Sequence, residues 1–186
     1  SATSGTAPTL VTGAGVPRSG TYALRTAATA ATSFARYHAY TSDQAIAGHF
    51  GVALKIETLP SATCTIVRFA SVANDPCAQI KLTAAGKIQL FDSNGTQIGS
   101  DSAATLSADG LYHLLELKCD STGSGAIALW LDDVSVASGA NFAQAAWARL
   151  VIGIISSTTA AFIWDDLKLN DDTGSTQTGR VGAGQI

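Results

Sequence analysis

Charged residues are scarce in this sequence. Only 13% of its 186 residues are Asp, Glu, Lys or Arg, and the 11 basic residues are scattered singly. A nucleic-acid-binding surface gathers Lys and Arg along a phosphate backbone, so we expect no nucleic-acid partner. No apolar run approaches the about 20 residues that a membrane-spanning helix requires. The N-terminus also lacks a charged segment followed by an apolar one, and we therefore expect no membrane partner.

Cysteine is also scarce. The three cysteines are an odd number and contain no C-x-x-C spacing, which argues against a zinc site or a redox pair. Cys64 and Cys119 each fall inside an apolar strand pattern, where a free cysteine commonly packs as a small core residue. We expect both to be buried, and one disulfide stays open.

Residues that would carry catalysis are few. The chain has two glutamates, Glu57 and Glu116, and they lack the spacing that sets a pair of carboxylates on one strand face for glycoside cleavage. The three histidines have no G-x-S-x-G elbow near them. A Ser-His-Asp arrangement is defined by geometry, so the sequence leaves it open. On balance the sequence predicts that the protein is not an enzyme.

What the sequence does contain is a series of short alternating segments. In His49–Leu59, the apolar residues alternate with Gly, Ala, Lys and Glu, as in a strand with one buried face. Between Gly86 and Asp133 such segments are separated by Asn-Gly, Asp-Gly and Ser-Gly, which are turn signals of antiparallel hairpins. Ala148–Ser156 has almost no polar face, so it is expected deep between two sheets. About a dozen short strands predict an all-β sandwich of two antiparallel sheets.

The sequence pattern of several segments is ambiguous. Thr26–Tyr40 is Ala-rich, which favours helix, but its Thr, Ser and aromatic content favours a strand over Phe34–Ala39. Asn141–Trp147 fits one helical turn or a loop. The pair Asp165-Asp166 interrupts the alternation of the last strand and predicts a bulge. We expect residues 1–170 to form the sandwich and residues 171–186 a Gly-rich C-terminal extension.

Four segments resemble the concanavalin A-like, laminin-G-like jelly-roll family. They read G-K-I-Q-L-F-D at Gly86–Asp92, D-G-L-Y-H-L-L-E-L at Asp109–Leu117, A-L-W-L-D-D at Ala128–Asp133 and F-I-W-D-D-L-K-L at Phe162–Leu169. The segment from Trp164 to Ile186 looks like the end of laminin-G-like proteins of tailed-phage virions. The resemblance implies a non-enzymatic virion protein that decorates or joins capsid or tail subunits.

That resemblance also implies partners and a location. The protein would reside in the virion and contact other virion proteins and copies of itself. The C-terminal extension would make these contacts through Arg180, Val181 and Ile186. A surface with few charges suits this role, because it lowers the desolvation cost of packing against another protein.

An alternative function is that of a carbohydrate-binding, lectin-like module. Trp130 lies on the face of its strand opposite Ile127, Leu129 and Leu131, so it is a candidate for stacking on a sugar, together with Tyr112.

The laminin-G resemblance also implies a candidate calcium site, because calcium takes oxygen ligands from loops. Asp132 and Asp133 are the candidate ligands. The simpler interpretation is that these aspartates form a turn, and no other cofactor is expected.

Overall fold

The computed structural model describes residues 5–45, 47–122, 125–140 and 146–171, and these residues form eleven β-strands. The described residues contain no helix long and apolar enough to cross a membrane. The strands are β1 (Thr9–Val11), β2 (Ala23–His38), β3 (Ala47–Thr58), β4 (Cys64–Ala70), β5 (Pro76–Leu82), β6 (Ile88–Phe91), β7 (Gln97–Ile98), β8 (Tyr112–Asp120), β9 (Ala126–Leu131), β10 (Val134–Ala140) and β11 (Arg149–Asp171).

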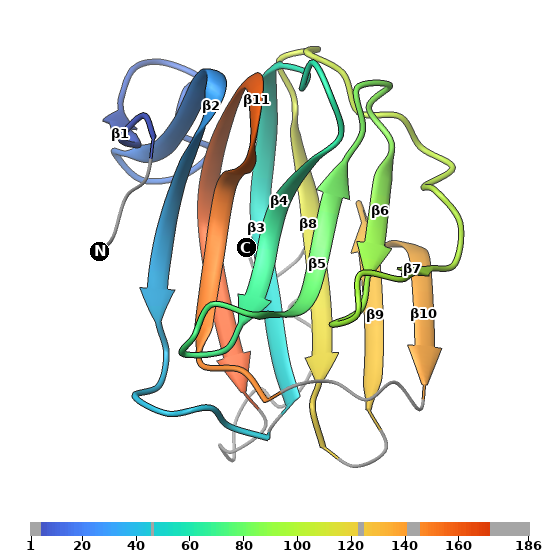
Figure 1. Ribbon diagram of the computed structural model, residues 1–186. Helices are drawn as coiled ribbons and strands as arrows, with labels where there is room; N and C mark the ends of the chain where they lie inside the picture. The colour runs from blue at the N-terminus through green and yellow to red at the C-terminus, as the bar shows by residue number, and fades with distance from the viewer. Residues whose placement is uncertain (1–4, 46, 123–124, 141–145, 172–186) are drawn as a thin grey trace.

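The strands make two antiparallel sheets that pack face to face. The front sheet has the order β2-β11-β4-β5-β6-β7 and the back sheet the order β1-β2-β11-β3-β8-β9-β10. Figure 1 shows the front sheet nearer the viewer, with β3, β8, β9 and β10 behind it. The jelly-roll sandwich predicted from the sequence is therefore confirmed.

Two long strands, β2 and β11, belong to both sheets. The first part of β11, up to Ile154, pairs with β2 and β4, whereas its later part pairs with β2 and β3. The register shifts between Ile154 and Ala160, where the strand turns from one sheet to the other. Gly153 permits a very close approach, because an added Cβ would lie 2.4 Å from the carbonyl oxygen of Ser33. The sequence predicted two strands here, and the structure has one that turns a corner.

The core lies between the sheets and is formed by the inward side of each alternating strand. Trp147 and Trp164 are both buried, and the indole nitrogen of Trp164 donates a hydrogen bond to the hydroxyl of Thr26 at 2.9 Å. All three cysteines are buried, as expected for Cys64 and Cys119, and none of them forms the disulfide that the sequence left open. The largest fully buried side chains are Trp147, Trp164, Phe50, Phe69, Phe162, Leu54, Ile56, Ile66, Ile80, Leu82, Ile88 and Leu90.

Local predictions have mixed outcomes. The bulge at Asp165-Asp166 is confirmed by a register shift between Asp165 and Lys168. The strand expected at Phe34–Ala39 is the second half of the longer β2. Strand β10 was not predicted at all. The segment 141–147, predicted as one helical turn or a loop, lies largely outside the described residues, and the C-terminal extension after Asp171 lies entirely outside them.

Candidate functional site: the arginine face

Three arginines project from the outer side of the front sheet. Along β11 the side chains of Leu150, Ile152 and Ile154 point into the core, so Arg149 and Val151 point outward. Arg36 on β2 and Arg68 on β4 are the direct partners of Val151 on either side, and they share its outward face. We call this surface the arginine face, formed by Arg36, Arg68, Arg149, Gln79, Lys81, Phe34 and Phe91.

The register aligns these residues across five strands. One continuous row runs Arg36, Val151, Arg68, Gln79 and Phe91 from β2 to β6. With neighbouring strands spaced about 4.8 Å apart, the row is about 19 Å long. The row is flanked on one side by Lys81, opposite Thr65, and on the other by Arg149, opposite His38.

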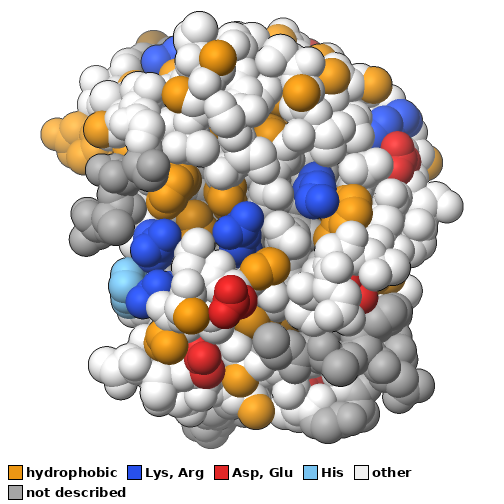
Figure 2. Space-filling model, viewed as in Figure 1, with side chains coloured by type: hydrophobic (Ala, Val, Ile, Leu, Met, Phe, Trp, Pro, Cys, Tyr) orange, Lys and Arg blue, Asp and Glu red, His pale blue; other side chains and the backbone are white. Residues whose placement is uncertain are grey.

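No acidic side chain among the described residues forms an ion pair with the three arginines. The Nε atoms of Arg36, Arg68 and Arg149 are buried and have no hydrogen-bond partner among the described residues. None of the ion pairs within the described part of the chain involves this face. Figure 2 shows Lys and Arg side chains gathered over the middle of the front sheet. A buried donor without an acceptor is unfavourable, so these three Nε atoms oppose folding unless an acceptor is supplied from outside the described residues.

The electrostatic effects all point the same way. Desolvation, and then the neighbouring charge of Arg36, lower the pKa of Arg68. Desolvation and Arg68 in turn lower the pKa of Lys81. Desolvation, Arg149 and Arg36 lower the pKa of His38 at the edge of the face. The charged forms of Arg68, Lys81 and His38 are thus disfavoured by burial and by neighbouring cations, and a bound anion would favour them.

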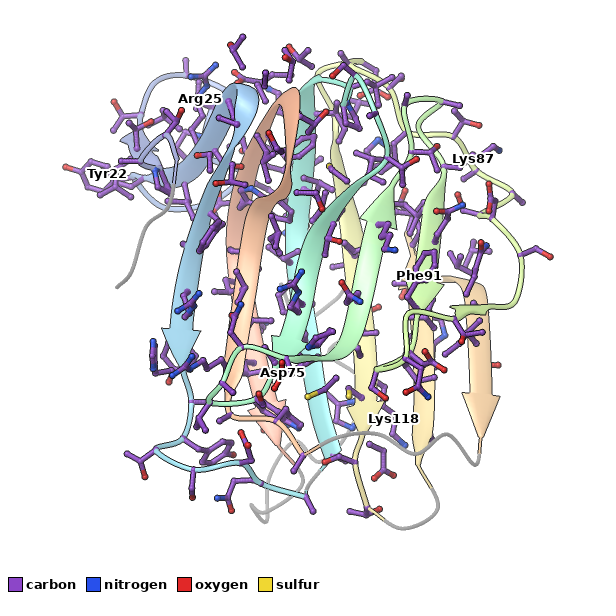
Figure 3. All side chains as sticks on the ribbon, in the orientation of Figure 1. Tyr22, Arg25, Asp75, Lys87, Phe91 and Lys118 are labelled. Atoms are coloured by element: carbon purple, nitrogen blue, oxygen red, sulfur yellow. The ribbon has the colours of Figure 1, made fainter. Side chains whose placement is uncertain are left out.

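Aromatic rings lie at both ends of the row. The ammonium nitrogen of Lys81 lies 3.6 Å from the centre of the Phe91 ring, and the guanidinium of Arg36 lies 5.8 Å from that of Phe34. Figure 3 shows Phe91 on β6, well above Asp75 at the lower turn of the same sheet. Between the ends, Gln79 accepts a hydrogen bond from Thr65 at 3.4 Å. Each of these two rings therefore lies under a cation of the same face, in a cation–π contact.

The predicted sugar-stacking residues lie elsewhere. Trp130 is half-buried on β9 of the back sheet, where it pairs with Glu116 of β8. Tyr112 starts β8, and its hydroxyl donates a hydrogen bond to the carbonyl oxygen of Val16 in the N-terminal loop. Both residues are therefore on the opposite side of the sandwich from the arginine face.

The predicted calcium ligands form a turn. Asp132 and Asp133 have φ values of 49° and 66°, which makes them the two residues of a type I′ turn between β9 and β10. The Asp132 carboxylate accepts hydrogen bonds from the Leu114 amide at 2.7 Å and from Nδ1 of His113 at 2.7 Å. No group of three or more His, Cys, Asp or Glu side chains suited to a metal occurs in the described part. Arg180, Val181 and Ile186 lie outside the described residues.

Sequence reasoning missed the arginine face entirely. Its members come from positions 36, 68, 79, 81 and 149, and only the sheet register brings them together. A signal was nevertheless present, because Arg68 and Arg149 each sit alone inside an apolar strand, in V-R-F-A and A-R-L-V. A lone Arg in a strand with no acidic residue at a partner position is the pattern to look for.

Comparison with known proteins gives structural likeness only. No family model and no curated protein sequence matches this chain. The structure is similar to an endo-β-1,4-glucuronan lyase from the fungus Trichoderma reesei, with a TM-score of 0.65, 15% identity, and coverage of 88% of this chain and 87% of that one. It is also similar to the cellulose-induced protein Cip1, with a TM-score of 0.68, 12% identity, and coverage of 97% and 90%. Alginate lyase AlyC3, solved with dimannuronate, gives a TM-score of 0.58, 7% identity, and coverage of 80% and 74%.

These likenesses confirm the concanavalin A-like sandwich and correct one prediction. The sequence predicted that the protein is not an enzyme, largely because it has no glutamate pair. Two of these three structures are polysaccharide lyases, so the fold carries carbohydrate chemistry other than glycoside hydrolysis. The lack of a glutamate pair is therefore no argument against catalysis, and that prediction is wrong.

Proposed function

We propose that this chain binds an acidic polysaccharide along the arginine face. The observation that carries the proposal is the row of guanidinium groups whose Nε atoms are buried without an acceptor. A guanidinium binds a carboxylate through two parallel hydrogen bonds, so Arg36, Arg68 and Arg149 suit a ligand with several carboxylates.

The shape of the face favours a polymer over a small anion. The row crosses five strands over about 19 Å, so it can contact several sugars of a polymer at once. Supporting likenesses come from a glucuronan lyase and from an alginate lyase solved with dimannuronate, whose ligands are uronic-acid sugars.

Binding to defined polysaccharides tests the proposal. Calorimetry or surface plasmon resonance would compare polyglucuronate and alginate with a neutral glucan and with single-stranded RNA. Because hydrogen bonds to charged groups contribute about 1.5–3 kcal/mol, Arg68→Met and Arg36→Met should each weaken binding to the acidic polymer roughly 10- to 100-fold.

Lys118→Met is the matched control, because it removes one positive charge from β8 of the back sheet, on the other side of the molecule (Figure 3). Equal affinity for the neutral glucan, or equal loss with Lys118→Met, would contradict the proposal. Tighter binding of RNA than of either acidic polysaccharide would also contradict the proposal and would indicate a ligand with a phosphate backbone.

The same experiment separates this face from the site predicted on the back sheet. Trp130→Ala should leave affinity for the acidic polymer unchanged if the arginine face binds it. A loss of affinity in Trp130→Ala, with none in Arg68→Met, would favour the lectin-like site at Trp130 and Tyr112.

The virion structural role also stays a prediction. Its expected contacts were placed on Arg180, Val181 and Ile186, which lie outside the described residues. Finding the protein in purified phage particles, or failing to find it there, would test that role without affecting the polysaccharide proposal.

A further inference from the structure

Lys81 brings an amine to the β6 end of the arginine face. It lies two residues from Gln79 on β5 and points outward, and its nitrogen folds over the ring of Phe91 at 3.6 Å. Phe91 is the direct partner of Gln79, which is the direct partner of Arg68. The Lys81 backbone lies beside the row, but its amine lies over Phe91, which belongs to the row. Gln79 stands between Phe91 and Arg68 in that row.

This set of groups matches the demands of an elimination reaction. In a 4-linked polymer of uronic acids, the hydrogen on C5 is adjacent to the carboxylate. Removing it requires that the carboxylate charge be neutralised and that a base lie beside C5. The guanidinium of Arg68 and the amide of Gln79 supply donors to the carboxylate, and Lys81 supplies the amine.

We propose that the arginine face also cleaves the acidic polysaccharide by β-elimination, with Lys81 as the residue that transfers the proton. Neutral Lys81 takes the proton from C5 of a uronate held by Arg68 and Gln79. The C5–H electron pair forms the C4=C5 double bond while the C4–O4 bond breaks. The leaving O4 then receives the proton from Lys81, so the amine is regenerated and no oxidant or cofactor is needed.

The surroundings of Lys81 fit this role. Desolvation and Arg68 lower the pKa of its ammonium group, which favours the neutral amine, while the contact with Phe91 acts in the opposite direction. On β6 it faces the neutral Gln89, whose amide is bound to the carboxylate of Asp101 at 2.8 Å. The rate should therefore rise as the pH is raised from neutral toward the ordinary lysine pKa, because the neutral fraction of Lys81 grows.

This inference rests on the proposed function, and the experiment separates the two. The full chain is incubated with polyglucuronate and with polymannuronate, and the C4=C5 double bond is followed by its ultraviolet absorbance. Binding is measured in parallel. Since general acid–base catalysis contributes about 100- to 10,000-fold, Lys81→Met should lower the rate at least about 100-fold.

Lys81→Arg is the decisive variant. It keeps the positive charge, and so it should keep the affinity, but a guanidinium does not lose its proton and should give no product. Lys87→Met, on the same sheet but bonded to the carbonyl oxygen of Ala103 at 2.7 Å, is the control and should keep the wild-type rate and pH profile.

Each outcome decides something different. Wild-type protein that binds the polymer and gives no product at any pH between 7 and about 10 would refute the cleavage and leave the binding proposal intact. Product formation by Lys81→Arg at the wild-type rate would refute the role of Lys81. An absence of binding to any acidic polymer would refute the proposed function itself.

Discussion

Replacing Arg68 by methionine should make the free protein more stable. The Nε atom of Arg68 is buried without a partner, and its charge is disfavoured by desolvation and by Arg36. A buried unsatisfied donor costs about 1–3 kcal/mol, and we take the lower end because the side chain as a whole is only partly buried. Methionine keeps the apolar stem, so the packing against Val151 should persist. The expected gain is about 1 kcal/mol, or a rise in Tm of about 2–4 °C.

Thermal and urea denaturation of the unliganded protein would measure this gain. Arg25→Met is the control, because Arg25 is an arginine whose guanidinium has an acidic partner, Glu57, at 2.6 Å. Loss of an exposed ion pair costs about 0–1 kcal/mol, so the control should be neutral or slightly destabilised. Added salt should shrink the part of the gain that comes from repulsion by Arg36 and leave the desolvation part.

Ligand should reverse the order of stabilities. A ligand at 100 times its Kd stabilises a protein by about 2.7 kcal/mol, and an acidic polysaccharide should therefore raise the Tm of the wild type well above that of Arg68→Met. A loss of more than about 1 kcal/mol of unfolding free energy in unliganded Arg68→Met would refute this prediction, because the guanidinium would then stabilise the fold.

Three further changes test the fold. Gly153→Ala should destabilise the protein by more than about 2 kcal/mol by denaturation, because the new Cβ would meet the Ser33 carbonyl, whereas Gly95→Ala, with open space around it, should cost only about 1 kcal/mol for its positive φ. Asp132→Ala should lower the free energy of unfolding in urea by about 1–2 kcal/mol, because alanine disfavours the positive φ of the turn and cannot accept the hydrogen bond from the Leu114 amide. Asp132→Asn should recover most of this loss. Burial raises the pKa of Cys64 to about 12, so a thiol reagent should modify it only after unfolding; rapid labelling of the native protein would contradict this burial.

The fold was predictable because it depends on local patterns. Alternation of apolar and polar residues fixes which side of a strand is buried, and Asn-Gly or Asp-Gly fixes where a hairpin turns. The strand face that the sequence assigned to Ile127, Leu129 and Leu131, opposite Trp130, is the buried face of β9. Strand β10 was not predicted, because its sequence V-S-V-A-S-G-A consists mostly of small residues. Its pairing with β9 is set by the Asp132-Asp133 turn rather than by an alternating pattern of its own.

The site was not predictable in the same way. Arg36 and Arg149 are 113 positions apart in the sequence and become neighbours only because β2 and β11 pair along both sheets. The number of residues before each strand corner sets that register, and the sequence does not display the corner. The acidic pairs drew attention because they are adjacent in the sequence, yet Asp132 caps a turn and Asp165 and Asp166 hold Arg18 and Ser19 of the N-terminal loop.

The charged residues of this chain are unevenly distributed over its surface. The chain carries more acidic than basic residues, 14 against 11, and yet Arg36, Arg68, Arg149 and Lys81 meet on one face with no carboxylate paired to them among the described residues. Solubility does not require this concentration, and stability opposes it, because burial and a neighbouring arginine lower the pKa of Arg68 and of Lys81. An arrangement that folding disfavours persists when function requires it. The lone arginines, rather than the acidic clusters, are therefore the residues on which the proposed function rests.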